Sequence, residues 1–245
     1  MKRIIIFLKN KTPVPIKSIL KFFKLHKLIS PLYNKYIHKY TAELEFQTQW
    51  AKEFKSNKNK VFEFWEEYRF LKEINKIIDI RESTRILDVG CGISTVLHFL
   101  KGQRCGIDPL AEEYKKLYTY PNDITILKGK GENIPFPDEY FDVVFCSNVL
   151  DHVSDPQKTI DNIFRVLKKN GFFILTVTII ERKIERDAAH PHSLTKPDIE
   201  NLLGSKFKKV FEGESPWIGE RRYARGERSN LDNELILLLQ KYTIP

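Results

Sequence analysis

Cysteine and long apolar runs are both scarce in this sequence. Its 245 residues include three cysteines, Cys91, Cys105 and Cys146, and no two of them form a C-x-x-C pair. An odd number without paired spacing argues against a disulfide framework and against a zinc site built from cysteines. No stretch approaches the roughly 18 consecutive apolar residues of a transmembrane helix, and the apolar run at residues 4–8 is too short for a signal peptide. We therefore expect a cytoplasmic protein.

Glycine and proline are also few. The chain has 11 Gly and 12 Pro, and 42% of its residues are hydrophobic. This composition excludes a fibrous or disordered chain. The length suits one domain with an appendage and is sufficient for a sizeable core.

Acidic residues are absent from positions 1–42, which carry ten Lys or Arg. The whole chain has 41 basic and 32 acidic residues, so the remainder is nearly neutral and its substrate cannot be inferred from charge. We expect residues 1–42 to form a lid on the domain that follows. The alternatives are binding to an anionic membrane surface, which would make the protein peripheral at the membrane, or to nucleic-acid phosphates.

The hydrophobic pattern divides the chain at about residue 80. Residues 1–80 predict a helical N-terminal extension, whereas residues 81–245 alternate between strand and helix. Strands are predicted at 85–89, 105–107, 124–127, 141–146, 172–177, 208–212 and 234–240, and helices at 61–80, 94–100, 111–117, 155–169 and 196–203. Such alternation is typical of an α/β fold with a parallel sheet covered on both faces.

The strongest chemical signal is the segment R-I-L-D-V-G-C-G-I-S at residues 85–94. A strand ends near Asp88, and Gly90 and Gly92 allow a tight turn that a ligand can approach closely. Asp108 follows about twenty residues later, where a carboxylate can bind both hydroxyls of a ribose. Thr95 replaces the third glycine of a dinucleotide motif, and the Asp88 carboxylate would repel a pyrophosphate. A cationic nucleoside such as S-adenosylmethionine (SAM) fits better.

Five motifs in the stretch from about Thr84 to Val177 resemble the class I SAM-dependent methyltransferases, in particular the group with a UbiE-like methyltransferase domain. They are D-V-G-C-G from Asp88, G-I-D-P from Gly106, G-E-N-I-P-F-P-D-E-Y-F-D-V-V from Gly131, N-V-L-D-H-V from Asn148 and I-F-R-V-L-K-K-N-G-F-F from Ile163. The resemblance implies a Rossmann-like, mostly parallel sheet of seven strands with the last one antiparallel. It also implies SAM as the cofactor and S-adenosylhomocysteine as the product.

The resemblance assigns roles to particular positions. The cofactor site that it implies comprises Asp88, Gly90, Cys91, Gly92, Asp108, Gly131, Glu132 and Asn148. Asp88 would interact with the methionine amino group, Asp108 with the ribose, the turn at 130–132 with the adenine, and Asn148 with the methionine end. Lys130 stands where relatives often have an aspartate that contacts the adenine amino group. Since lysine cannot accept that hydrogen bond, a backbone carbonyl or Glu132 would replace it.

His152 and its neighbour Asp151 are the candidates for catalysis. They lie just past the fourth strand, near the expected methyl group, and a base helps when the acceptor is a hydroxyl or an ammonium group. The alternative is that His152 only caps the loop or packs against the cofactor.

Two further groups are candidates for acceptor binding. They are His190 and His192, after the fifth strand, and Arg221 and Arg222, in an arginine-rich loop suited to anionic groups. Alternatively, the histidines only fix the shape of their loop, and the arginines lie on a solvated hairpin. A metal site at the two histidines lacks a definite third ligand in the sequence, so no metal is expected.

These features predict methyl transfer from SAM to an oxygen or nitrogen nucleophile of a small-molecule, glycan or lipid-linked acceptor. An RNA methyltransferase and a SAM-binding, non-catalytic partner subunit are the alternatives. The sequence contains no recognisable nucleic-acid-binding module, which favours the first hypothesis.

Overall fold

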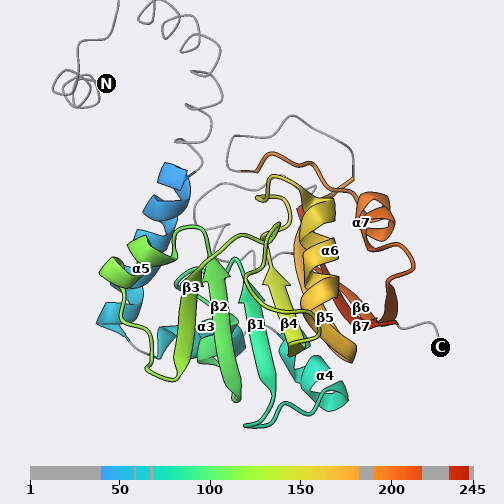
Figure 1. The fold of residues 1–245 in the computed structure, drawn as a ribbon. Helices are drawn as coiled ribbons and strands as arrows, with labels where there is room; N and C mark the ends of the chain where they lie inside the picture. The colour runs from blue at the N-terminus through green and yellow to red at the C-terminus, as the bar shows by residue number, and fades with distance from the viewer. Residues whose placement is uncertain (1–39, 58, 67–68, 182–189, 217–231, 243–245) are drawn as a thin grey trace, which may run out of the picture.

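The computed structural model describes residues 40–57, 59–66, 69–181, 190–216 and 232–242. They form an α/β fold around a seven-stranded sheet (Figure 1). The strands are β1 Arg85–Val89, β2 Gln103–Asp108, β3 Ile124–Lys128, β4 Phe141–Ser147, β5 Leu167–Ile180, β6 Phe207–Pro216 and β7 Asp232–Lys241. They lie in the order β3-β2-β1-β4-β5-β7-β6.

The first five strands are parallel, whereas β7 runs antiparallel to both β5 and β6. This confirms the expected sheet, which is mostly parallel with one reversed strand. From β1 the chain continues to β2 and β3 on one side of that strand, and it then returns to form β4 and β5 on the other side. The direction of strand addition therefore reverses between β1 and β4. In open α/β sheets, ligands bind outside the carboxyl ends of the strands at such a switch point.

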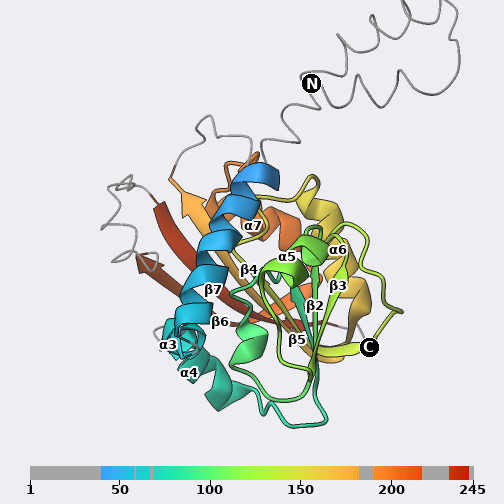
Figure 2. The same ribbon diagram turned by 90° about the vertical axis from the view of Figure 1, so that its left-hand side faces the viewer.

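Helices cover both faces of the sheet (Figure 2). They are a helix at residues 40–56, α3 Lys60–Glu66, α4 Arg69–Ile77, α5 Ala111–Leu117, α6 Pro156–Val166 and α7 Lys196–Leu203. The first four share a core cluster with one face of the sheet, and α6 and α7 pack on the other. No helix in these described ranges is long and apolar enough to cross a bilayer.

Residues 143–146 of β4 form a continuously apolar run. Val143 and Phe145 belong to the core on one face of the sheet, and Val144 and Cys146 belong to the core on the other. Because successive side chains of a strand point to opposite faces, the part of a strand that is covered on both sides is apolar at successive positions.

The helices before residue 80 pack into the same core as the sheet. Phe54, Trp65 and Ile74 are buried in one cluster with Ile86 of β1. Of the single helix expected at 61–80, the structure describes α3 and α4, and residues 67–68 between them lie outside the described ranges. Of the basic segment, residues 1–39 lie outside the described ranges, so its role as a lid stays a prediction.

The helix expected at residues 94–100 is absent, and only a 3₁₀ turn, η1 Val96–His98, occurs there. The Arg104 guanidinium binds the carbonyls of Leu97 and Leu100, at 2.9 and 3.0 Å. His98 Nε2 lies 3.2 Å from the carbonyl oxygen of Ile93. Side chains therefore use the carbonyls that a continuing α-helix would need. After the glycine turn the chain therefore forms a 3₁₀ turn in place of the expected helix.

Candidate functional site

The glycine turn after β1 is tightly packed against its surroundings. Gly90 and Gly92 have φ angles of 71° and 54°, in the region that favours glycine. The backbone N–H groups of Gly90 and Cys91 both donate to the carbonyl of Ile107, at 2.8 and 3.1 Å. A Cβ atom on Gly90 would lie 2.4 Å from a methyl group of Val149. No larger residue fits at Gly90 without displacing its neighbours.

Two buried carboxylates flank this turn. Asp88, in β1, accepts a hydrogen bond from the Thr95 hydroxyl at 2.6 Å. Asp108, at the end of the adjacent β2, accepts hydrogen bonds from the backbone N–H groups of Leu110 at 2.8 Å and Gly92 at 3.3 Å. Burial raises the pKa of each carboxyl group to about 7. A cationic ligand would offset the cost of ionising them there.

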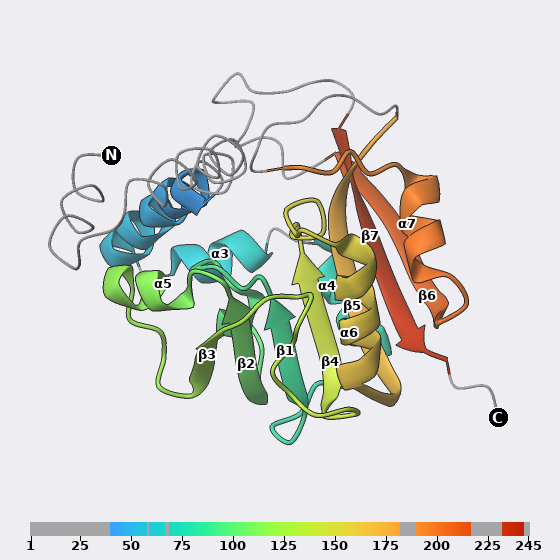
Figure 3. The ribbon, with the colours of Figure 1, turned by 45° about the horizontal axis from the view of Figure 1, so that its top comes forward.

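Three side chains brace the turn from outside β1 and β2. The Gln47 amide oxygen, in helix 40–56, accepts a hydrogen bond from Ile93 N at 2.7 Å. Trp65 Nε1, in α3, donates to the Ser94 carbonyl at 2.8 Å, and the Tyr120 hydroxyl donates to the Gly92 carbonyl at 2.8 Å. Figure 3 shows helix 40–56 and α3 beside α5, near the carboxyl ends of β1 and β2. The sequence did not reveal Gln47, Trp65 or Tyr120 as supports of the site.

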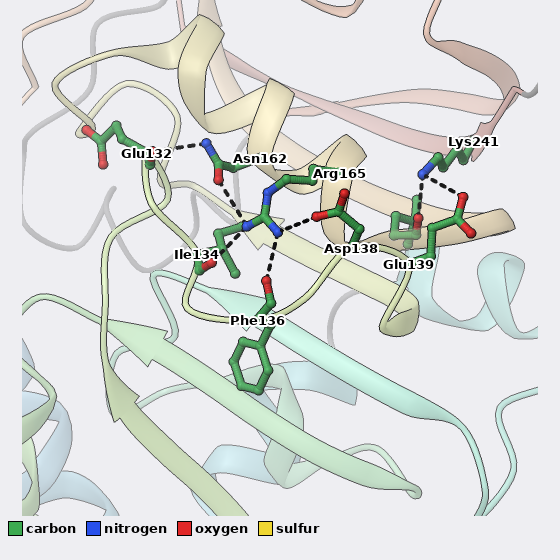
Figure 4. Close-up of polar contacts among 9 residues, drawn as sticks. Glu132, Ile134, Phe136, Asp138, Glu139, Asn162, Arg165 and Lys241 are labelled. Atoms are coloured by element: carbon green, nitrogen blue, oxygen red, sulfur yellow. Dashed lines mark hydrogen bonds and ion pairs between the residues drawn. The ribbon is translucent and has the colours of Figure 1, made fainter.

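The loop expected to contact the adenine is held by α6. The Arg165 guanidinium donates to the carbonyls of Ile134 at 2.8 Å and Phe136 at 2.7 Å (Figure 4). Asn162 Nδ2 donates to the Glu132 carbonyl at 3.0 Å. A Cβ atom on Gly131 would lie 2.7 Å from a methyl group of Thr159, so α6 packs closely on this loop.

The Glu132 side chain is engaged within the protein. Its carboxylate accepts hydrogen bonds from the backbone N–H groups of Ser154 at 2.6 Å and Asp155 at 3.3 Å, just before α6. Of the two expected substitutes for the missing adenine contact, the Glu132 carboxylate thus also serves to hold its loop against the start of α6. The placement of Gly131 and Glu132 beside an adenine stays a prediction.

Asn148 follows β4 in a left-handed conformation, with a φ of 57°. Its backbone N–H donates to the Thr176 carbonyl at 2.8 Å, and its side-chain oxygen accepts a hydrogen bond from the Thr178 hydroxyl at 3.1 Å. These contacts hold Asn148 at the carboxyl edge of the sheet. The next residue, Val149, packs on Gly90, so the end of β4 adjoins the glycine turn.

The structure brings three of the expected site residues together past Asn148. Asp151, His152 and His190 each place a nitrogen or carboxylate oxygen within 4.8 Å of the others. His152 Nε2 lies 3.8 Å from Asp151 Oδ1, and the two imidazole centroids are 4.3 Å apart. We call these three residues the histidine cluster. It joins a catalytic candidate with one of the two histidines expected to bind the acceptor.

His192 has a different position. Its Nε2 lies 2.9 Å from the Val153 carbonyl oxygen, and its backbone N–H donates to the Asp151 carbonyl at 3.4 Å. These contacts fix the loop after β5 to the turn after β4, as the alternative interpretation of this residue predicted. Arg221 and Arg222 lie outside the described residues.

Glu234 was missed at the sequence level. It is a buried residue of β7, paired in register with Thr178, the residue that binds Asn148. Burial raises its pKa to about 7. In the sequence, Glu234 is the first residue of the predicted strand 234–240, and it was interpreted only as the boundary of that strand.

Comparisons with known proteins identify similarity to methyltransferases. The family model described as "Methyltransferase domain" matches residues 87–175. YcgJ of Bacillus subtilis, named an uncharacterized methyltransferase, is 32% identical over 108 residues, which are 41% of this chain and 43% of that protein. The ubiquinone/menaquinone biosynthesis C-methyltransferase UbiE of Vibrio campbellii is 41% identical over 49 residues, which are 20% of this chain and 19% of that protein. The chain thus spans less than half the length of each of these two curated relatives.

Solved structures share the fold. The crystal structure of Bacillus subtilis YcgJ aligns with a TM-score of 0.53 and 18% identity, over 73% of this chain and all of that one. The [4+2]-cyclase SpnF aligns with a TM-score of 0.54 and 19% identity, over 72% of this chain and 81% of that one. At such identities the likeness concerns the fold alone. The matched residues 87–175 contain both buried carboxylates, the glycine turn, and two members of the histidine cluster.

Proposed function

We propose that this chain is a class I SAM-dependent methyltransferase, as its fold and the match of residues 87–175 support, and that it transfers the methyl group of SAM to an oxygen or nitrogen nucleophile. S-adenosylhomocysteine is the other product. The acceptor that we propose is a small molecule, a glycan or a lipid-linked intermediate. The observation that carries this proposal is the pair of buried carboxylates, Asp88 and Asp108, on either side of a glycine turn.

The residues present fit SAM. Its methionine ammonium group would lie near Asp88, and the ribose hydroxyls would donate to Asp108. A carboxylate has about four lone-pair directions, so Asp108 retains capacity beyond its bonds to Leu110 and Gly92. Gly90 and Gly92 allow the tight turn between the two carboxylates, because Val149 and Gln47 occupy the space that side chains at these positions would need. When bound, SAM supplies an electrophilic methyl group on a positively charged sulfur.

The acceptor would lie at the histidine cluster, because Asn148 and Val149 link this cluster to the glycine turn. Methyl transfer is an in-line displacement, for which holding the two reactants in place contributes on the order of 7–11 kcal/mol. His152 is placed to take the proton of an acceptor hydroxyl or ammonium, with Asp151 beside it. His190, His192, Arg221 and Arg222 are the proposed contacts for the rest of the acceptor.

Calorimetric titration with SAM, and in parallel with NADH, tests the cofactor. Binding of SAM at micromolar concentration with no response to NADH would support the proposal and lead to acceptor screening by methyl incorporation. Folded protein that binds NADH and ignores SAM would overturn it. Binding of SAM without turnover until another protein is added would instead favour a non-catalytic subunit.

A further inference from the structure

We propose that Asp151, His152 and His190 bind a divalent transition-metal ion of the zinc class, and that this ion holds the acceptor. Metal binding itself does not depend on the proposed methyl transfer. The use of the ion in acceptor recognition rests on that function.

The spacing of the three side chains supports a metal site. Their potential ligand atoms all lie within 4.8 Å of one another. Around tetrahedral zinc, with bonds of about 2.0–2.1 Å, neighbouring ligand atoms are roughly 3.4 Å apart. The Asp151–His152 separation of 3.8 Å is close to this value. His152 and His190 are only half-buried, so a small rotation of either ring can close the remaining distance.

The ligand set is chemically appropriate. Two imidazoles and one carboxylate are three of the usual protein ligands of zinc, and a three-residue set leaves a coordination position for water or substrate. The Asp151 side chain is 2% exposed, where a nearby cation stabilises an ionised carboxylate. One carboxylate with a divalent ion leaves a single positive charge. The site would therefore favour an acceptor that binds as an oxyanion.

The surrounding backbone holds the two parts of the cluster in place. His192 N donates to the Asp151 carbonyl, and His192 Nε2 contacts the Val153 carbonyl. Further along, Ile180 N donates to the Leu194 carbonyl at 3.0 Å and closes the base of the same loop. His190 is therefore carried by a loop tied to the Asp151–Val153 turn. Such support around the ligands commonly determines metal affinity.

The position of the cluster suits acceptor binding. His152 N and Val153 N donate to the Val149 carbonyl in a single turn, at 2.9 and 3.2 Å, and Val149 packs on Gly90. The ion would thus lie one turn of chain from the methionine end of the cofactor site. An acceptor hydroxyl bound to it would release its proton to water. The oxygen would then form the new C–O bond as the C–S bond of SAM breaks.

This assignment makes a different demand on His152 from that of a general base. A nitrogen that coordinates a metal ion does not accept the acceptor proton. The ion would lower the pKa of the bound hydroxyl and so replace the base. Methyl transfer by the metal-depleted protein distinguishes the two roles: it would continue if His152 is a general base and stop if His152 is a metal ligand.

The test uses the full chain without a histidine tag, stripped with a chelator and titrated with zinc by calorimetry and with cobalt by visible absorption. We expect the protein to bind one equivalent of either metal ion, and the cobalt complex to show the visible absorption of four-coordinate cobalt. His190→Ala should weaken binding by at least about 100-fold. Glu181→Ala is the matched control, because it removes an exposed carboxylate at the start of the same loop that does not belong to the cluster; its metal affinity should change little.

Each outcome has a distinct meaning. A chain that binds SAM but neither metal overturns the metal site and leaves the proposed function intact. Equal metal affinity in wild type and His190→Ala also overturns it. Metal binding that depends on His190, in a chain that ignores SAM, supports the site and rejects the proposed function. Because His190 is half-buried in a loop, its alanine variant should fold even if a change at buried Asp151 does not.

Discussion

The side-chain oxygen of Gln47 accepts a hydrogen bond from the backbone N–H of Ile93, at 2.7 Å and across 46 positions of sequence. This contact connects helix 40–56 to the glycine turn. A Cβ atom on Gly92 would lie 2.6 Å from Gln47 Nε2, so the amide also packs directly on the turn. The helical segment before the sheet is therefore part of the candidate cofactor site.

Gln47→Ala should lower both stability and SAM affinity. It leaves the buried Ile93 N–H without its acceptor, which costs about 1–3 kcal/mol, and it loosens the turn. We expect a decrease in SAM affinity of about tenfold, measured by calorimetry. Gln49→Ala is the matched control, since Gln49 is exposed in the same helix. If both variants bind SAM equally well, Gln47 does not support the site.

Asp108→Asn should weaken SAM binding by about tenfold or more, because a charge-assisted hydrogen bond contributes about 1.5–3 kcal/mol. The substitution preserves shape and removes the charge that would bind the ribose hydroxyls. Asp79→Asn, at an exposed site away from the sheet edge, should leave binding unchanged. An unaltered affinity in folded Asp108→Asn would contradict the ribose assignment.

Glu234 should make the protein less stable at high pH. Burial raises its pKa from 4.5 to about 7, so the folded state holds this proton more tightly than the unfolded state. The resulting stabilisation of the folded state, on the order of 3 kcal/mol, is fully present below the pKa that Glu234 has in the unfolded state. It is lost as the pH rises through about 7.

Chemical denaturation of wild type and Glu234→Gln at pH 5 and pH 8 measures this contribution. Asp88 and Asp108 have pKa values raised in the same direction, so both proteins should lose stability with rising pH. The loss should be smaller in Glu234→Gln. Identical losses in the two proteins would show that Glu234 does not titrate in this range.

Arg165→Met should loosen the loop at residues 130–139 while the sheet remains folded. The backbone carbonyls of Ile134 and Phe136 lose the hydrogen bonds that they accept from the Arg165 guanidinium (Figure 4). Hydrogen exchange in this loop should accelerate, with a loss of about 1–3 kcal/mol in global stability. Arg81→Lys, at an exposed ion pair, serves as control. Unchanged exchange in the loop would show that other contacts hold it.

The sequence predicted the local parts of the site well. A strand followed by two glycines placed Asp88 at the sheet edge, and the end of the next strand placed Asp108 there. Both depend on short-range patterns. The pairing of His190 with Asp151 and His152 depends instead on the spatial proximity of the loops after β4 and β5, which no local spacing encodes. The missing helix at 94–100 has a different and local cause, because Arg104 of β2 binds the carbonyls of Leu97 and Leu100 a few residues before it.

The insertion of β7 between β5 and β6 has a consequence for the order of folding. β6 is synthesised first, but in the finished sheet it pairs with β7 and is separated from β5 by that strand. Until β7 is available, β5 presents an open apolar edge, since Leu235–Leu239 of β7 supply its buried neighbours. Open edges of this kind pair readily with other chains. A chain cut short before Asp232 should therefore aggregate during synthesis rather than accumulate as a folded, inactive domain.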